Sequence, residues 1–596
     1  MALDSYSPGV SYTEDEVIPE VVGPDQLCVG IVGGAKKGPT DLTLITTVPQ
    51  LWSVFGTLSH EDFGVWAAWR AVKNGGKVYY KRVIGAGATY GEAKVDGKAL
   101  SFETKEFDST LNDMIVRVAL GGGKQGTASV AGTGLKFITK DKNATLNGYT
   151  IKVEEADDKY TITVSDGETV KETVEGLVTK AGDENNIFVK FNKTSTLLTV
   201  QPAKGEGFVG VCTIRGAEND KYIVSCVQGK KTVERFTGMD LDEGSTHNLV
   251  AVINKKSTYI NAEQIAGVEV KDDNITGDYK IAGCNDGIAT ITPDQLVEAI
   301  EIFQNTDTLD VSSVIAPGCF DSKVLGALKS LAEARGDIQT IPDCPSGLTK
   351  NELIDWANAS GDYESDTKMD SMHQGAYWPW VYDEDPHTRE VFLTPPSGWV
   401  VSQFIYNDKT AGAWFSSAGV QEGRGRGVLV GAKGLEYEMT KEERDEIYVE
   451  AQVNPIVRFY NKGIAIWGNR TCYRDTSGSQ NSFYTYMNIR RLANYIRKIV
   501  ISESLKLVFD PNDSLTWRAW KLAISPRLDV IKANRGIEAY KLVMDESTVT
   551  EEAISKGEMP GIIYVKPIKA VEYIPISFII TEDSVTFEET TEEGEA

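Results

Sequence analysis

The sequence has few of the residues with which proteins build metal or redox centres. Its seven cysteines are scattered along 596 residues without a CxxC pair, and its four histidines form no HExxH motif. This spacing excludes the common zinc patterns and gives no disulfide framework. We therefore expect the cysteines to be small buried residues, and we predict no metal site and no cofactor.

Long apolar runs and positive charge are also scarce. No apolar stretch reaches the roughly 18 residues of a membrane-spanning helix, and the opening MALDSYSPGVSYTEDEV lacks the layout of a secretion signal. The formal net charge is −25, whereas a nucleic-acid-binding protein needs a basic face. We expect no membrane insertion, no direct nucleic-acid partner, and a protein that is made and used in the cytoplasm or released by lysis.

What the sequence does contain begins as alternating strand and helix. QLCVGIVGG predicts a strand, SHEDFGVWAAWRAVKNGG a helix, and KVYYKRVIG a second strand. Ser59 is placed to cap the helix and Gly75 to follow its end. Such a βαβ opening predicts an α/β fold, and the chain length predicts three or more domains.

The glycine-rich loop after the first strand, GGAKKGP, resembles a phosphate-binding loop only in part. Gly33 and Gly38 have the spacing of GxxxxGK[ST], but Pro39 stands where the lysine is required. The following TDLTLITTV favours a strand over the helix that would hold an anion. A later GxGxxG match, at Gly121, Gly123 and Gly126, also lacks a following helix. We interpret both segments as turns.

The middle of the chain has a different pattern. Short alternating runs separated by Gly, Asn and Asp predict small β-domains, which we divide into residues 93–204, an outer inserted β-domain, and 205–275, a second β-rich part. After about residue 280 the strand–helix pattern returns, with Thr292 and Pro293 as a helix start. The sequence thus predicts an α/β core, a mixed sheet with flanking helices, formed by 21–92 and 276–565 and carrying a β-rich insertion.

Two late segments predict long helices with a local basic cluster. They are SFYTYMNIRRLANYIRKIVISESL and DSLTWRAWKLAISPRLDVIKANRG. In so acidic a chain, this concentration of positive charge predicts an interacting surface. The cluster comprises Arg490, Arg491, Arg497, Lys498, Arg518, Lys521 and Arg527.

Both ends of the chain predict extended arms, at residues 1–20 and 566–596. In KPIKAVEYIPISFII, alternate positions place Ile574, Ile576 and Phe578 on one face of a strand, and the acidic TEDSVTFEETTEEGEA follows. The strands either pair within their own subunit or join a neighbouring sheet. The candidate inter-subunit residues are Pro8, Val10, Tyr12, Tyr573, Ile574, Ile576 and Phe578.

Motifs for catalysis are absent from the sequence. There is no GxSxG and no Cys–His pairing, and EGRGRG, Glu422–Gly427, is weak support for a phosphate contact. A nucleotide-dependent α/β enzyme is therefore an alternative with little support, and we predict a protein that is not an enzyme.

Several segments, in order along the chain, resemble the tail sheath proteins of contractile-tailed bacteriophages, including the T-even-like branch. The resemblance covers about 1–92 and 276–596, whereas the insertion is only weakly similar. Ser417 departs from the usual proline and Ser402 from the usual alanine. The matching segments are SPGV, VGIVGGAKKGPTDLTLIT, LWSVFG, NGGKVYYKRV, AGCNDGIATITPDQLVEAI, DVSSVIAPG, PPSGWVVSQFIYNDKTAGAWFSSAG, NPI, GIAIWGNRT, NIRRL, FDPND and YVKPIKAVEYIPISF.

The resemblance implies a structural role. Six subunits would form each ring, and rings would stack helically around a tail tube and contract without a nucleotide. The implied partners are other copies of the chain, the tail tube protein, and the baseplate and tail terminator proteins. The implied location is the virion, after assembly in the host cytoplasm. Arg490, Arg491, Arg497 and Lys498 would face the tube. A tailocin or another contractile injection system is an alternative owner of the same sheath.

Overall fold

The structure, a computed structural model, describes residues 27–572 except for short gaps, so both predicted arms lie almost entirely outside it. The gaps are 132–134, 142–143, 157–158, 183–185, 192–194, 202–208, 218–220, 243, 269–270, 365, 422–425 and 475–481. The described chain forms two compact units. We call them the α/β unit (up to Gly34, Pro39–Val83 and from Thr292 on) and the β-rich unit (Ala35–Gly38 and Ile84–Ile291).

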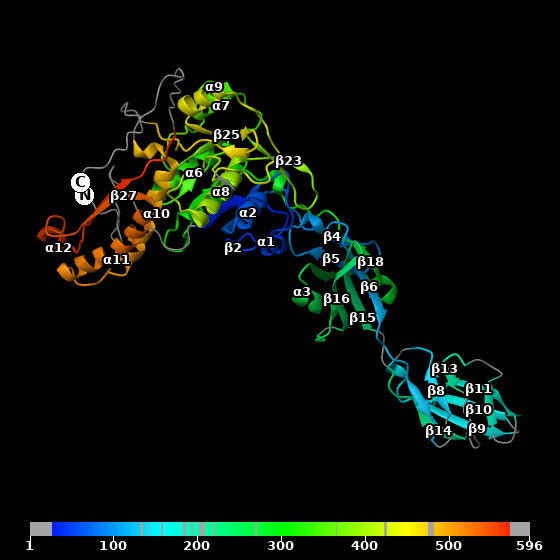
Figure 1. Cartoon of the computed structure of the whole chain (residues 1–596). Coiled ribbons are helices and arrows are strands. Elements are labelled where there is room, and N and C mark those ends of the chain that lie inside the picture. Colours follow the sequence, from blue (N-terminus) through cyan, green and yellow to red (C-terminus); the bar gives the residue numbers. More distant parts are fainter. Residues whose placement is uncertain are drawn as a thin grey trace, which may run out of the picture. The chain divides into compact units, whose positions relative to one another are not determined.

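The α/β unit is built on a mixed five-stranded sheet of order β2-β3-β1-β19-β20. β1 is parallel to β3 and β19, and β2 is antiparallel to β3. All six residues of β1 are buried, as in a parallel strand covered on both faces. The predicted mixed sheet with flanking helices is therefore present (Figure 1). The strands are β1 Cys28–Gly33, β2 Thr43–Ile45, β3 Lys77–Arg82, β19 Ser313–Ile315 and β20 Gln339–Thr340.

Helices of the α/β unit contact this sheet, and the unit contains further sheets. Two of them have the orders β21-β25-β26 and β23-β22-β24, and a third, two-stranded sheet is described below. The helices are α1 Val48–Phe55, α2 Gly64–Lys73, α5 Pro293–Glu301, α6 Ser322–Arg335, α7 Lys350–Asn358, α8 Pro396–Thr410 and α9 Lys441–Glu446. The further strands are β21 Ala376–Trp378, β22 Val381–Glu384, β23 Val391–Thr394, β24 Gly434–Leu435, β25 Val453–Phe459 and β26 Gly463–Ile466.

A buried ion pair joins α2 to β22. Arg70 donates from Nε to Asp383 over 2.7 Å, and the indole of Trp66 donates to the same carboxylate over 2.8 Å. The guanidinium also lies 3.6 Å from the ring centroid of Trp399 on α8. Because every polar group in this contact has a partner, the helices are held in one arrangement.

The predicted helix starts have different outcomes. Thr292 and Pro293 are confirmed, because α5 begins at Pro293 with a capping box between Thr292 and Gln295. Ser59 is wrong as a cap, because α2 begins only at Gly64, whose N–H donates to Asp62 over 2.8 Å. The N-cap residue is Phe63, whose side chain makes no capping bond, and the Asp62 carboxylate satisfies one free N–H of the first turn.

The β-rich unit contains two sheet pairs, each with its own hydrophobic core. The proximal pair has the orders β16-β15-β6-β18 and β17-β5-β4, and the distal pair β12-β11-β10-β9-β14 and β13-β8-β7. The proximal elements are β4 Glu92–Lys94, β5 Leu100–Thr104, β6 Ile115–Gly121, β15 Lys221–Gln228, β16 Lys231–Met239, α3 Leu249–Lys256, β17 Ile260–Gln264, α4 Asp272–Ile275 and β18 Gly277–Lys280. The distal elements are β7 Thr127–Ser129, β8 Lys136–Thr139, β9 Thr150–Ala156, β10 Lys159–Asp166, β11 Thr169–Gly182, β12 Asn186–Phe191, β13 Leu198–Gln201 and β14 Gly210–Thr213.

The predicted borders of the insertion, 93 and 275, and its division at 204/205 are corrected by the structure. Strand β18 lies beyond 275 but pairs with β6, so the unit extends to Ile291. Its two parts are nested, since β6 pairs with β15 across the whole distal part. The sequence showed strands but not their partners, and long-range pairing decides domain borders.

Among the residues that the structure describes, no helix is both long and apolar enough to cross a bilayer.

A first prediction concerns Gly30 in β1. A Cβ at this position would lie 2.5 Å from the ring of Phe303, which is fully buried. Gly30→Val should therefore lower the free energy of unfolding by about 1–3 kcal/mol, measured by urea unfolding. Gly326→Ala in α6 is the control, because its nearest neighbour is a hydroxyl at 3.2 Å and alanine favours a helix. Equal stability of Gly30→Val and the parent would contradict the packing argument.

Candidate functional site

The glycine-rich loop after β1 is filled by protein. A Cβ at Gly33 would lie 2.9 Å from the Cα of Gly64 at the start of α2, and the Tyr80 hydroxyl donates to the carbonyl of Gly34 over 2.5 Å. Further along, the N–H of Gly38 donates to the Glu106 carboxylate over 3.3 Å. A loop N–H that faces a carboxylate is a poor phosphate donor, so the loop serves packing.

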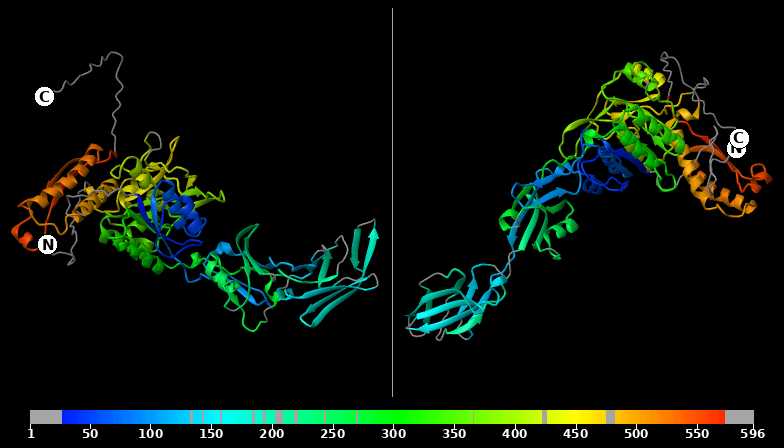
Figure 2. Two further views of the ribbon diagram at one scale, coloured as in Figure 1. Left: turned by 90° about the horizontal axis from the view of Figure 1, so that it is seen from below. Right: turned by 180° about the vertical axis from the view of Figure 1, so that it is seen from behind.

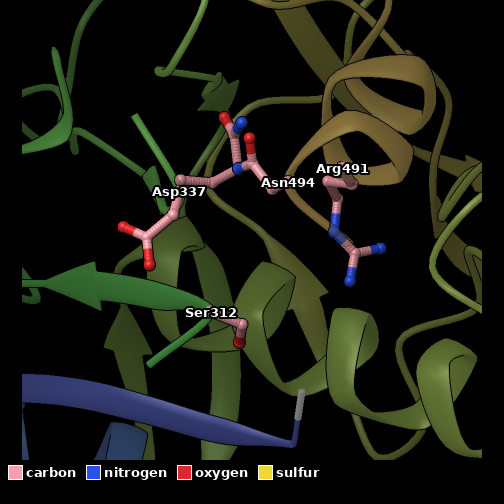
Figure 3. A pocket seen from close by; sticks show the side chains of 5 residues that line it. Ser312, Asp337, Arg491 and Asn494 are labelled. Atoms are coloured by element: carbon pink, nitrogen blue, oxygen red, sulfur yellow. The ribbon is translucent and has the colours of Figure 1, made fainter. Parts of the chain in front are cut away.

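A small polar cavity lies elsewhere in the α/β unit, at the amino ends of β19 and β20 (Figure 3). Ligands of open α/β sheets bind beyond the carboxyl ends of the strands, which is the opposite edge. Asp337 is bonded to Arg335 over 2.8 Å, and Arg491 to Asp408 over 2.6 Å. These charged groups hold the fold together. The lining residues are Ser312, Asp337, Gln339, Arg491 and Asn494.

The predicted tube-facing residues are not on an outward basic face. Arg490 and Arg491 on α10 (Met487–Leu505) are 2% and 7% exposed. Arg497 donates to the carbonyl of Gly336 over 2.6 Å, and Lys498 pairs with Asp310 over 2.5 Å. The structure corrects the prediction because the inner side of α10 uses these long side chains to satisfy buried acceptors. Arg518 and Arg527 on α11 (Ser514–Ala533) are exposed.

Among the described residues there is no group of three or more His, Cys, Asp or Glu side chains arranged to hold a metal ion.

The last part of the α/β unit is a separate layer of helices and a two-stranded sheet. Figure 2 shows that the orange helices and the red strands stay together when the molecule is turned. Its core includes Trp414, Ile496, Trp520 and Ile524. The elements are α10 Met487–Leu505, α11 Ser514–Ala533, β27 Ile537–Val543, α12 Glu551–Ser555 and β28 Ile562–Pro567.

As far as the structure describes the chain, the sheet of this layer has two open edges. β27 and β28 pair with each other in antiparallel register from Ile537–Pro567 to Val543–Ile562. Within the described part of the chain neither strand has a second neighbour. Each strand therefore presents one row of backbone N–H and C=O groups to a further strand. A two-stranded sheet alone is only marginally stable, so added strands would stabilise it.

Exposed apolar side chains gather on the same layer. Leu515, Leu522 and Val530 of α11 are 74%, 63% and 57% exposed, and Tyr564 of β28 is 43% exposed. The opposite face of α11 packs into the core through Trp520, Ile524, Leu528 and Ile531. Large apolar side chains exposed on a helix, next to open strands, are typical of a surface that another chain covers.

The chain is anchored to the core where the described part ends. Glu572 accepts a hydrogen bond from Arg470 over 3.1 Å and from the Tyr448 hydroxyl over 3.2 Å. Burial raises the pKa of Tyr448 well above its ordinary value, so the phenol stays a donor. Any C-terminal arm therefore starts after Glu572, not at 566 as predicted, because Lys566 and Pro567 belong to β28.

The predicted arm residues, Pro8 to Tyr12 and Tyr573 to Phe578, lie outside the described residues, and their contacts stay a prediction. The sequence reasoning missed β27 and the Glu572 anchor. The only signal for β27 was IEAYKLV, a short run with partial alternation after a predicted helix.

The fold and the matching segments define a class of protein, the tail sheath proteins, to which this chain is similar. No family model matches the chain. The crystal structure of the sheath tail protein DSY3957 from Desulfitobacterium hafniense superimposes with a TM-score of 0.50 at 9% identity. That match covers 94% of this chain and all of the other. It supports a shared fold.

Two curated relatives are particular members of that class. The tail sheath protein of Enterobacteria phage T4 is 24% identical over 54% of this chain, and that of Vibrio phage KVP40 is 23% identical over 66%. The matches cover 49% and 58% of those relatives, so the chain spans about half the length of the curated relatives it matches. The resemblance predicted from the motifs is confirmed.

A second prediction concerns the buried pair of Arg491 and Asp408. Burial raises the pKa of Asp408, and the Arg491 guanidinium opposes that rise. Arg491→Ala should lower the free energy of unfolding by about 3–5 kcal/mol, because it leaves a buried carboxylate without its partner. Chemical denaturation measures this. Arg518→Ala, at an exposed position of α11, is the control and should change it by less than about 0.5 kcal/mol. Equal effects would restore an outward role for Arg491.

Proposed function

We propose that this chain is a structural subunit of a contractile tail sheath. It polymerises as stacked hexameric rings around a tail tube, and contraction drives the tube through the host envelope. The similarity to tail sheath proteins supports the class. The observation that carries the proposal is the two-stranded sheet β27–β28 with its two open edges.

The number of edges fits the number of arms. The sheet offers one edge on β27 and one on β28, and the sequence predicts one extended arm at each end of the chain. An N-terminal arm with Pro8, Val10 and Tyr12 and a C-terminal arm with Ile574 and Ile576 would complete a four-stranded sheet. When the arms come from neighbouring subunits, the contact repeats from copy to copy and builds an open filament.

The energy of such contacts suits a lattice. A net backbone hydrogen bond contributes about 1 kcal/mol, so an arm of about 6–8 residues contributes several kcal/mol. That is comparable with micromolar binding at about 8 kcal/mol. Each contact alone is therefore reversible, whereas a subunit held by two arms in a shared lattice stays bound.

Contraction follows from the difference between core and arms. The α/β unit is fixed by buried pairs such as Arg70–Asp383, so it moves as a rigid body. The chain beyond Glu572 would act as the hinge between subunits. The extended lattice would be the higher-energy state, so the chain needs no nucleotide, no cofactor and no catalytic site.

In the assembled tail the subunit would also contact proteins other than copies of itself. They are the tail tube protein inside the rings, and the baseplate and tail terminator proteins at the two ends. The subunit would belong to the virion and would be assembled in the host cytoplasm. The exposed α11 face, with Leu515, Arg518 and Leu522, replaces the α10 arginines as the surface available for such contacts.

A third prediction tests the C-terminal arm. Removing residues 573–596 should leave a folded monomer that forms no tubes, because β28 and the Glu572 anchor remain while the arm is gone. Negative-stain electron microscopy and sedimentation measure assembly, and thermal melting measures folding. Removing only the acidic residues 582–596 is the matched control and should leave tubes intact. Normal tubes from the longer truncation would contradict the arm proposal.

A fourth prediction tests whether the arm reaches another subunit. One chain carries Ile576→Cys and the other Lys541→Cys on β27, and the two are mixed under assembly conditions with a flexible thiol cross-linker. Covalent dimers should form, because each chain carries only one of the two introduced cysteines and a cross-link between them must join two chains. Lys280→Cys, 65% exposed on β18, is the control in place of Lys541→Cys and should give none. If cross-links form only within a chain that carries both cysteines, the arm pairs with its own subunit.

A further inference from the structure

The two parts of the β-rich unit have related sequences. Residues 91–113 read GEAKVDGKALSFETKEFDSTLND, and residues 126–148 read GTASVAGTGLKFITKDKNATLNG. Matching positions include Leu100 with Leu135 and Phe102 with Phe137, which are buried in the proximal and distal cores respectively. The same order of core residues thus occurs twice.

The later halves also correspond. Residues 220–238 read DKYIVSCVQGKKTVERFTG, and residues 158–176 read DKYTITVSDGETVKETVEG. A third pair is NLVAVINKKST in the proximal part, from Asn248, and NIFVKFNKTST in the distal part, from Asn186. The first of these contains α3 and the second β12, so the copies differ in that element.

Strand pairing repeats as well. The order β16-β15-β6-β18 corresponds to β11-β10-β9-β14, and β17-β5-β4 corresponds to β13-β8-β7. Even the irregular positions match. The register of β15 against β16 shifts at Tyr222/Val224 and Cys226/Val227, and that of β10 against β11 shifts at the equivalent Tyr160/Ile162 and Val164/Ser165. Bulges at equivalent positions indicate common descent.

An asparagine clamp occurs in both parts. The Asn112 side chain donates to the carbonyl of Cys284 over 2.7 Å and accepts from its N–H over 3.0 Å. Asn147 makes the same two bonds with Ala217, over 2.7 and 2.9 Å. In each part the clamp joins the segment before the third strand to the segment after the last.

A glutamate cap is repeated in the same way. Glu234 accepts from the Ser257 hydroxyl over 2.6 Å and from the Thr258 N–H over 2.8 Å. In the distal part Glu172 accepts from the Ser195 hydroxyl and the Thr196 N–H, both over 2.5 Å. Fold similarity alone does not require the same side chain at the same loop.

The chain enters the distal part at a hairpin of the proximal part. In the distal part β9 and β10 are separated by two residues, and Ala156 faces Lys159. In the proximal part the equivalent pair is Gly121 and Lys221. The two-residue connection of one copy is thus replaced, in the other, by residues 122–220.

We propose that the β-rich unit consists of two copies of one module, and that the distal copy is a self-contained guest held in the β6–β15 hairpin of the proximal copy. The hairpin is an acceptor position at which the chain carries an added domain. The guest closes on itself through its own core and its Asn147 clamp. The host does not need the guest to fold, because a two-residue connection like that between β9 and β10 can join β6 directly to β15.

The test replaces residues 122–220 by Asp-Asp, the connection between β9 and β10. We expect a soluble protein in which the α/β unit melts within ~5 °C of its melting temperature in the parent chain. Amide hydrogen exchange should show that β6 and β15 are still paired. The control variant lacks residues 93–204, the outer β-domain predicted from the sequence alone. This deletion takes away β4–β6, which belong to the host module, so the host module should be unfolded. An unfolded host module in the first variant would overturn the proposal.

A second measurement uses the full-length chain, with protease sites introduced at Gly123 and Glu218. After cleavage, the distal fragment should separate from the rest of the chain on gel filtration. It should be a folded monomer with the circular dichroism spectrum of a β-sheet protein. A fragment that is unfolded, or that stays bound to the remainder, would overturn the proposal even if the shortened chain folds.

Discussion

An unpaired strand edge must be covered, and this constraint connects the main features of the molecule. β27 and β28 form a two-stranded sheet in which, among the described residues, neither strand has a second neighbour. This sheet lies at the point where the chain leaves the core after Glu572. In the proposed assembly, strands from the arms of other subunits would pair with these edges.

Buried charge makes the core rigid enough for such a role. Arg70 with Asp383, Arg335 with Asp337, and Arg491 with Asp408 are ion pairs inside the α/β unit. Breaking any of them leaves a charge without water or partner. In the proposed sheath the α/β unit would therefore move as a rigid body.

Much of the fold was predictable because it depends on local signals. The sequence correctly predicts the strand at β1, from its apolar run, and the helix start at Thr292–Pro293. It also predicts the return of strand–helix alternation after residue 280. The site was predictable only in part. Alternation and resemblance predict the arms but not β27. The prediction that Arg490 and Arg491 face outward is wrong, because α10 is buried along most of its length.

The sequence by itself determined the fold class, the scarcity of metal ligands and the similarity to tail sheath proteins, because composition, periodicity and ordered motifs are local properties of the chain. Only the tertiary structure decided the nesting of the two β-modules, the open edges of β27–β28 and the inward role of the α10 arginines. These features depend on which distant segments pair, and pairing over long sequence distances is fixed by packing rather than by any single segment.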